Sequence, residues 1–170
     1  MTDSSKRIAL LGTGLIGGSL GLIWAERRPD WTVVGHDRPD VLDRAFDRSA
    51  VDERAADPVT AVDGADIVVL ATPLGATLKI LEQIAPHLDE GTIVTDVASV
   101  KSPVMEQAAD VLPGHVHFVG GHPMAGAETS GIDAADALVF ENAIYALCLP
   151  STTEETDLDG LLSPLVDLIS

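Results

Sequence analysis

The stretch Ile8-Ala-Leu-Leu-Gly-Thr-Gly-Leu-Ile-Gly-Gly-Ser19 decides the fold of this chain. An apolar run typical of a buried strand leads directly into a turn with glycines at 12, 14 and 17, and an apolar helical segment follows. This is the G-x-G-x-x-G spacing in the strand–turn–helix context that binds dinucleotides. Gly12 permits the tight turn, Gly14 lets a pyrophosphate approach the backbone, and Gly17 lets the helix pack closely on the strand. The helix N-terminus supplies unpaired N–H groups to that pyrophosphate.

A second apolar strand, Thr32–His36, predicts which cofactor this turn would hold. It ends at Asp37, about 20 residues beyond the glycines, where an acidic side chain accepts hydrogen bonds from the ribose hydroxyls. A carboxylate there would repel a 2′-phosphate and favours NAD, whereas Arg38 would pair with that phosphate if it turned inward, so NADP remains the alternative. The full set of expected cofactor-binding residues is Gly12, Thr13, Gly14, Leu15, Ile16, Gly17, Asp37, Arg38, Thr72 and Pro73.

Strand-like and helix-like runs alternate along the rest of the chain. This alternation predicts an α/β fold of the Rossmann type, a doubly wound and mainly parallel sheet with helices on both faces. Predicted strands are Arg7–Leu11, Thr32–His36, Ile67–Ala71, Ile93–Asp96, Val116–Val119 and Ala143–Leu149. Predicted helices are Leu15–Arg27, Pro39–Arg48, Ala76–Ala85 and Pro103–Val111. Residues 157–170 have apolar positions at helical spacing and stop in mid-pattern, so we expect the chain to be part of a longer protein.

Composition limits the classes of partner. The chain has 170 residues, with 27 acidic and 10 basic side chains and a formal net charge of −17. Nucleic acid and anionic membranes are therefore unfavourable partners, and the acidic excess also suggests adaptation to salt. The single cysteine, Cys148, excludes an internal disulfide and favours a reducing, cytoplasmic setting. His115 and His117 alternate along a strand, but nothing nearby completes a metal site, and none is predicted.

Polar residues that carry chemistry follow the later strands, at the edge where α/β sheets bind ligands. Ser99 and Lys101 follow the fourth predicted strand; Ser99 would bind a substrate or orient an imidazole, or else only cap the next helix. His122 lies in the glycine-rich stretch predicted as a loop after the fifth strand. Because imidazole titrates near neutrality, His122 is a natural acceptor for an alcohol proton during hydride transfer.

Three segments taken together resemble one enzyme family. Gly12-Thr-Gly-Leu-Ile-Gly-Gly-Ser-Leu20, Asp96-Val-Ala-Ser-Val-Lys101 and Gly121-His-Pro-Met-Ala-Gly-Ala-Glu128 resemble, in order and spacing, the prephenate and arogenate dehydrogenases of tyrosine biosynthesis. The resemblance implies oxidative decarboxylation of prephenate to 4-hydroxyphenylpyruvate, with NAD or NADP accepting the hydride. It implies that His122 accepts the ring hydroxyl's proton and that Ser99 orients that hydroxyl. Expected substrate-binding residues are Ser99, Lys101, His122 and Gly126.

The resemblance also implies a domain organisation. Residues 1–156 would form the dinucleotide-binding domain, and 157–170 would begin a helix leading toward a helical substrate and dimerisation domain that this chain lacks. Without that domain, the choice between prephenate and arogenate stays open. Two other readings remain: a Rossmann dehydrogenase of a 3-hydroxy acid, and a dinucleotide-binding module without catalysis. The second has no use for Ser99 and His122 together, so their joint presence favours an enzyme.

Overall fold

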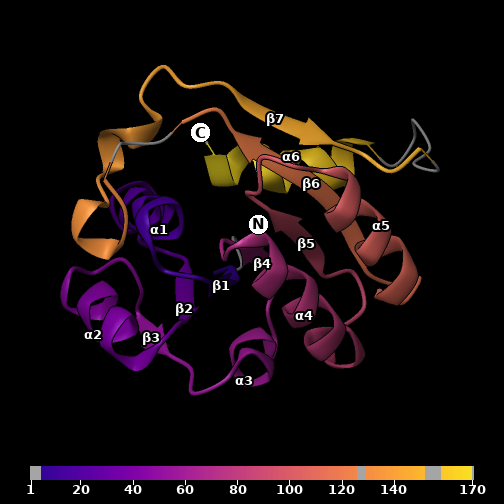
Figure 1. Cartoon of the computed structure of the whole chain (residues 1–170), viewed down its shortest axis with the longest axis horizontal. Coiled ribbons are helices and arrows are strands. Elements are labelled where there is room, and N and C mark those ends of the chain that lie inside the picture. Colours follow the sequence, from indigo (N-terminus) through magenta and orange to yellow (C-terminus); the bar gives the residue numbers. More distant parts are fainter. Residues whose placement is uncertain (1–4, 126–128, 152–157, 170) are drawn as a thin grey trace.

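The protein is built around one sheet (Figure 1). The computed structural model describes residues 5–125, 129–151 and 158–169. In this part of the chain the strand order is β3-β2-β1-β4-β5-β6-β7, and each neighbouring pair is parallel except β6 and β7. The strands are β1 (Arg7–Leu11), β2 (Thr32–His36), β3 (Glu53–Arg54), β4 (Ile67–Leu70), β5 (Ile93–Asp96), β6 (His117–Pro123) and β7 (Tyr145–Cys148).

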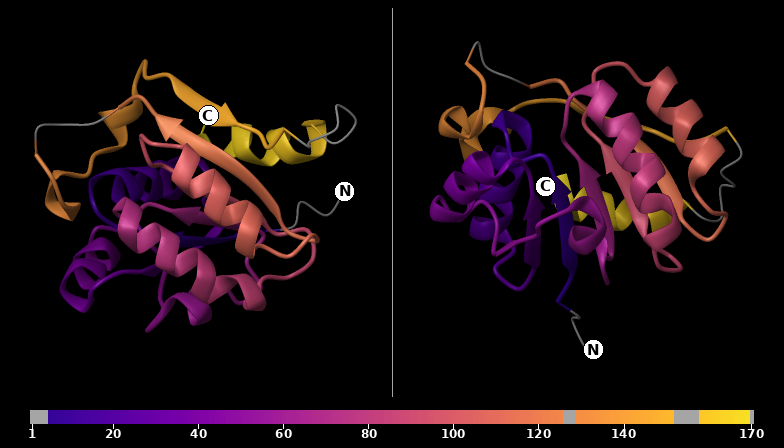
Figure 2. Two further views of the ribbon diagram at one scale, coloured as in Figure 1. Left: turned by 45° about the vertical axis from the view of Figure 1, so that its right-hand side comes forward. Right: turned by 60° about the horizontal axis from the view of Figure 1, so that its bottom comes forward.

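Helices cover both faces of the sheet (Figure 2). On one face lie α1 (Leu15–Arg27), α2 (Pro39–Asp47), α6 (Leu158–Ile169) and the short 3-10 helices η2 (Ile132–Ala134) and η3 (Ala137–Phe140). On the other face lie α3 (Pro58–Val62), α4 (Leu74–Ile84) and α5 (Ser102–Val111), and the 3-10 helix η1 (Ala85–His87) follows α4. The predicted doubly wound, mainly parallel sheet is therefore confirmed.

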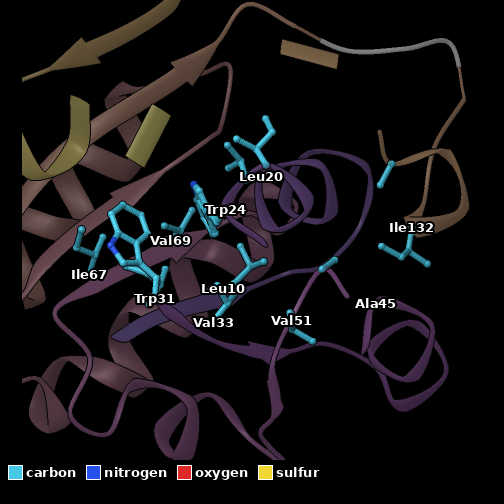
Figure 3. Packing of buried hydrophobic residues seen from close by; sticks show 14 of the residues in the cluster. Leu10, Leu20, Trp24, Trp31, Val33, Ala45, Val51, Ile67, Val69 and Ile132 are labelled. Carbon is cyan, nitrogen blue, oxygen red and sulfur yellow. The ribbon is translucent and has the colours of Figure 1, made fainter. Parts of the chain in front are cut away.

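The two cores follow from the strand pattern. Successive side chains of a strand point to opposite faces, and here Leu10 joins one apolar cluster while Leu11 joins the other. Strands covered on both sides have to be apolar at every position, as β4 is throughout Ile67–Leu70. Figure 3 shows the first cluster, in which Trp24 of α1 and Leu10 of β1 are almost completely buried.

The predicted end of the fifth strand was wrong. We expected a strand over Val116–Val119 and a loop carrying His122, but β6 continues to Pro123. The reason is that β7 returns antiparallel beside β6 and pairs with its last residues, including His122 with Ala146. His122 thus lies in a strand. Besides the short 3-10 helices η1, η2 and η3, the strand β3 and the helix α3 were not predicted. With two and five residues, they are too short for periodicity to reveal.

The helix predicted from the apolar spacing of residues 157–170 is present as α6. It packs against the sheet of its own domain, where Leu165 is buried at 1% exposure and Ile169 packs against the same cluster. Its expected continuation toward a helical domain stays a prediction. Among the described residues, no helix has the length and apolarity needed to span a membrane.

Candidate functional site

The glycine turn between β1 and α1 forms a cradle. Gly12 has a φ of +98°, and a Cβ there would come within 2.5 Å of the Ala71 carbonyl oxygen, so only glycine fits. A Cβ on Gly17 would clash with the Gly12 carbonyl oxygen. Because glycine has no Cβ, α1 can start close against the turn. At Gly14, by contrast, a Cβ would meet no described atom within 4 Å. The middle glycine therefore faces open space, where a ligand can contact the backbone.

The start of α1 gives this cradle its polarity. Gly14 is the N-cap of this 13-residue helix, and no side chain caps it. The first N–H groups of a helix lack partners within the helix, and the dipole places partial positive charge there. In a chain with a net charge of −17, the cradle is thus locally suited to an anion such as a pyrophosphate.

Asp37 is fixed at the end of β2 beside the cradle. Its Oδ2 accepts hydrogen bonds from the Thr13 backbone N–H at 2.7 Å and from the Thr13 hydroxyl at 3.3 Å, and its Oδ1 accepts one from the Arg38 N–H at 2.7 Å. The carboxylate also lines a hollow of about 500 Å³ whose wall includes His36, Arg38 and Leu42. The sequence predicts the adenosine half of a dinucleotide beside Asp37, and this assignment stays a prediction.

A second hollow, of about 380 Å³, lies on the other side of the glycine turn. It lies near the carboxyl ends of β1 and β4, the neighbouring strands between which the strand order reverses. Open α/β sheets bind ligands at this position. The structure brings five of the predicted site residues together in its wall: Leu15, Ile16, Thr72, Pro73 and Ser99. The Thr72 and Thr77 hydroxyls are hydrogen-bonded at 2.9 Å, which fixes the β4–α4 turn that forms part of this wall.

His122 lies one strand further along the same edge. It is half-buried near the carboxyl end of β6, the strand next to β5, and Ser99 lies in the loop that leaves β5. Both residues therefore lie at the same end of the sheet, although His122 is not among the residues that line the hollow with Ser99. Gly126, the remaining predicted substrate residue, lies outside the described residues. The roles predicted for all of these residues stay predictions.

Lys101 has a position that spacing alone did not indicate. Its ammonium forms an ion pair with the Asp96 carboxylate and donates a hydrogen bond to the Gly121 carbonyl oxygen. Asp96 is completely buried, and its other contacts are backbone N–H groups, from Ala98 at 3.0 Å and from Gly121 at 3.1 Å. Sequence reasoning missed Asp96, although an acid that ends an apolar strand five residues before a lysine is a visible signal.

Tyr145 of β7 was also missed. Its ring and hydroxyl lie 3.0 Å from the point where a Cβ on Gly121 would be. That Cβ would also clash with the Asp96 backbone carbonyl oxygen, so only glycine fits at position 121. Burial, and then the negative charge of Asp96, raise the pKa of Tyr145 above its usual value of 10.0. Tyr145 therefore remains a neutral phenol over the physiological pH range.

Comparison with known proteins agrees with this geometry. The family model for the nucleotide-binding domain of prephenate dehydrogenase matches residues 20–168. The chain belongs to this family. Prephenate dehydrogenase of Lactococcus lactis is 41% identical over 162 residues, and that of Bacillus subtilis 37% over 163 residues. These alignments cover 94% and 95% of this chain but 44% of each relative, so the chain spans a little under half the length of these two relatives.

Solved structures of this family superpose closely. Synechocystis arogenate dehydrogenase is 38% identical with a TM-score of 0.83, over 95% of this chain and 56% of that one. Prephenate dehydrogenase from A. aeolicus, in complex with hydroxyphenyl propionate and NAD+, is 26% identical with a TM-score of 0.85, over 99% of this chain and 59% of that one. The shared fold therefore extends over nearly the whole chain.

Proposed function

We propose that this chain is the NAD-binding part of a dehydrogenase that oxidatively decarboxylates prephenate to 4-hydroxyphenylpyruvate, and that it also carries the catalytic histidine. The observation that carries the proposal is the open cradle at Gly14, together with Asp37, which is hydrogen-bonded to the adjacent Thr13, and the hollow that Leu15, Ile16 and Ser99 line. Membership of the prephenate dehydrogenase family supports the substrate class. The NAD+ bound to the A. aeolicus relative supports the choice of cofactor.

The residues of the chain would divide the binding task. The N–H groups at the start of α1 hold the pyrophosphate, and Asp37 accepts hydrogen bonds from the adenosine ribose. Thr72 and Pro73 form the wall beside the nicotinamide. NAD, when bound, takes up the hydride that leaves the carbinol carbon of the substrate. The acidic Asp37 disfavours the additional phosphate of NADP.

Two side chains would handle the substrate hydroxyl. His122, as a neutral imidazole, accepts its proton while Ser99 donates or accepts a hydrogen bond that orients it. Loss of carbon dioxide makes the ring aromatic and drives the reaction, so the protein mainly positions the reactants. Arogenate differs from prephenate in its side chain, away from the reacting ring carbon. The 38% identity to an arogenate dehydrogenase makes arogenate the second candidate substrate.

The proposal includes the setting of the longer protein. We place it in the cytoplasm, in tyrosine biosynthesis, as a homodimer whose subunit contact and substrate-carboxylate site lie largely outside this chain. The single cysteine, Cys148, supports the reducing compartment. The alignments cover only 44% of each of the two prephenate dehydrogenases, which supports assigning those functions to the part of such a longer protein that does not align with this chain.

The test separates cofactor binding from turnover. NAD and NADP are titrated into the purified chain by calorimetry, and prephenate or arogenate is then added while nicotinamide reduction is followed by absorbance. We expect saturable binding, with NAD preferred over NADP. Absence of NAD binding would overturn the proposal. Reduction with prephenate alone, or with arogenate alone, would decide the substrate.

A further inference from the structure

The backbone pairing between strands β5 and β6 stops before β6 itself ends. The last paired residues of the two strands are Thr95 and Val119, and β6 continues to Pro123. Beyond that point Gly121 uses side chains in place of a neighbouring strand: its N–H donates to Asp96 Oδ1 at 3.1 Å, and its carbonyl oxygen accepts from Lys101 Nζ. One ion pair thus binds both backbone groups of the residue that precedes His122.

The alternation of backbone groups explains why Gly121 is the residue held. In an antiparallel pair, successive residues direct their N–H and C=O groups to opposite sides. The Met124 N–H donates to the Ile144 carbonyl oxygen at 2.8 Å, and His122 pairs with Ala146. The backbone N–H and C=O groups of the even-numbered residues here therefore point toward β7. The backbone N–H and C=O groups of Gly121 therefore point toward the β5 side. His122 is held by β7 on one side and, through Gly121, by the Asp96–Lys101 pair on the other.

The same ion pair fixes the loop that carries Ser99. The Ala98 N–H donates to Asp96 Oδ2 at 3.0 Å, and Lys101 at the other end of the loop is the N-cap of α5. Ser99 lies between these two attachments. Asp96 is completely buried and the Lys101 side chain is 17% exposed, so the loss of either partner would leave a charge uncompensated in the interior.

We propose that Asp96 and Lys101 are positioning residues. Their side chains continue the hydrogen bonding between β5 and β6 past the last paired residues, and so hold the Ser99 loop and the His122 backbone at a fixed separation. The inference rests on the proposed roles of Ser99 and His122. It assigns Lys101 to the protein's own backbone and not to the substrate carboxylate. Its ammonium already has two oxygen partners, one of them a buried carboxylate.

Amide hydrogen exchange, followed residue by residue by NMR, tests the proposal on this chain. In Lys101→Met we expect the Gly121 amide to exchange at least about tenfold faster relative to the amide of Val69, a completely buried residue of the central strand β4. Lys101→Arg restores a cation with several donors, and we expect it to bring the ratio back to within about threefold of wild type. Lys79→Met removes the same charge from an exposed position on α4 and should leave the ratio unchanged.

A purely structural role gives a different result. If Lys101 contributes only to overall stability, the Gly121 and Val69 amides speed up by the same factor, and that outcome would overturn the proposal. Asp96→Asn, which keeps the side-chain shape, supplies the same comparison if Lys101→Met does not fold. NAD titration runs alongside. Wild-type protein that fails to bind NAD would overturn the proposed function and leave the exchange result standing.

Discussion

At the scale of single residues, the chain offers a direct probe of the site, because Tyr145 is its only tyrosine. Burial and the Asp96 charge raise the pKa of Tyr145, so the folded state keeps the phenolic proton at pH values where the unfolded chain has lost it. Stability is therefore lost as the pH rises above 10.0, the ordinary tyrosine value. We expect tyrosinate absorbance to appear only together with alkaline unfolding measured by circular dichroism. Ionisation near pH 10 in folded protein would contradict the placement of Tyr145.

His122 is the residue whose replacement separates catalysis from binding. We expect His122→Asn to leave NAD affinity within about threefold of wild type and to reduce turnover of prephenate by at least about 100-fold, because the proton acceptor is lost. Steady-state kinetics and calorimetry measure the two effects. His87→Asn removes an exposed imidazole from η1 and serves as the control. Equal turnover in the two variants would exclude His122 as the proton acceptor.

The residues that could be predicted from the sequence are those whose role depends on local spacing. The glycines at 12, 14 and 17, and Asp37 at the end of the next strand, follow from one βαβ unit and lie together as expected. Asp96 carries a local signal, but its role beside Gly121, like that of Tyr145, could not be found in this way. Their contacts with Gly121 join segments 25 and 24 positions apart in the chain, and no local pattern encodes such a contact.

At the scale of elements, the close approach of α1 to β1 is the contact most sensitive to a single methyl group. We expect Gly17→Ala to destabilise the protein by about 1–3 kcal/mol, because the new Cβ would clash with the Gly12 carbonyl oxygen. Gly75→Ala is the matched control in α4, where a Cβ meets no described atom within 4 Å and alanine favours the helix by up to about 1 kcal/mol. Urea unfolding measures both. A Gly17→Ala protein as stable as Gly75→Ala would contradict this packing.

The helix α6 belongs to the core of this domain. Leu165 is 1% exposed within the cluster that also contains Trp24 and Ile93. We expect Leu165→Ala to cost about 2–5 kcal/mol of unfolding free energy, the range for a buried leucine truncated to alanine. Val166→Ala, at a 47% exposed position of the same helix, should cost much less. Similar unfolding midpoints for the two variants would mean that α6 does not pack on the sheet in solution.

Elements could be predicted where they are long and periodic. The apolar strands Arg7–Leu11 and Thr32–His36 and the helix Leu15–Arg27 have the predicted bounds, because each buries a continuous apolar pattern. The end of β6 could not be predicted, since it depends on pairing with β7, more than 20 residues later. The glycines around His122 indicate a loop when only local propensity is considered, and tertiary pairing overrides that propensity.

At the scale of the whole molecule, the net charge of −17 decides how stability responds to salt. Self-repulsion of like charges opposes the compact state, and raising the salt from 0.1 to 1 M shortens the screening length from about 10 to about 3 Å. Salt also weakens favourable ion pairs. Three of those described, Arg7–Glu53, Arg44–Asp133 and Arg54–Asp43, have side chains that are 33–70% exposed, and exposed pairs contribute little.

The repulsive contribution should therefore dominate. We expect the thermal midpoint to rise steadily between 10 mM and 1 M NaCl, as calorimetry or circular dichroism would record. Sodium chloride is the appropriate salt because sulfate also strengthens apolar burial and would confuse the two effects. A midpoint that stays constant or falls would mean that self-repulsion among the 27 acidic side chains does not limit stability, and it would remove the argument for adaptation to salt. The buried Asp96–Lys101 pair is shielded from solvent ions, so its hold on Gly121 should persist across the whole salt range.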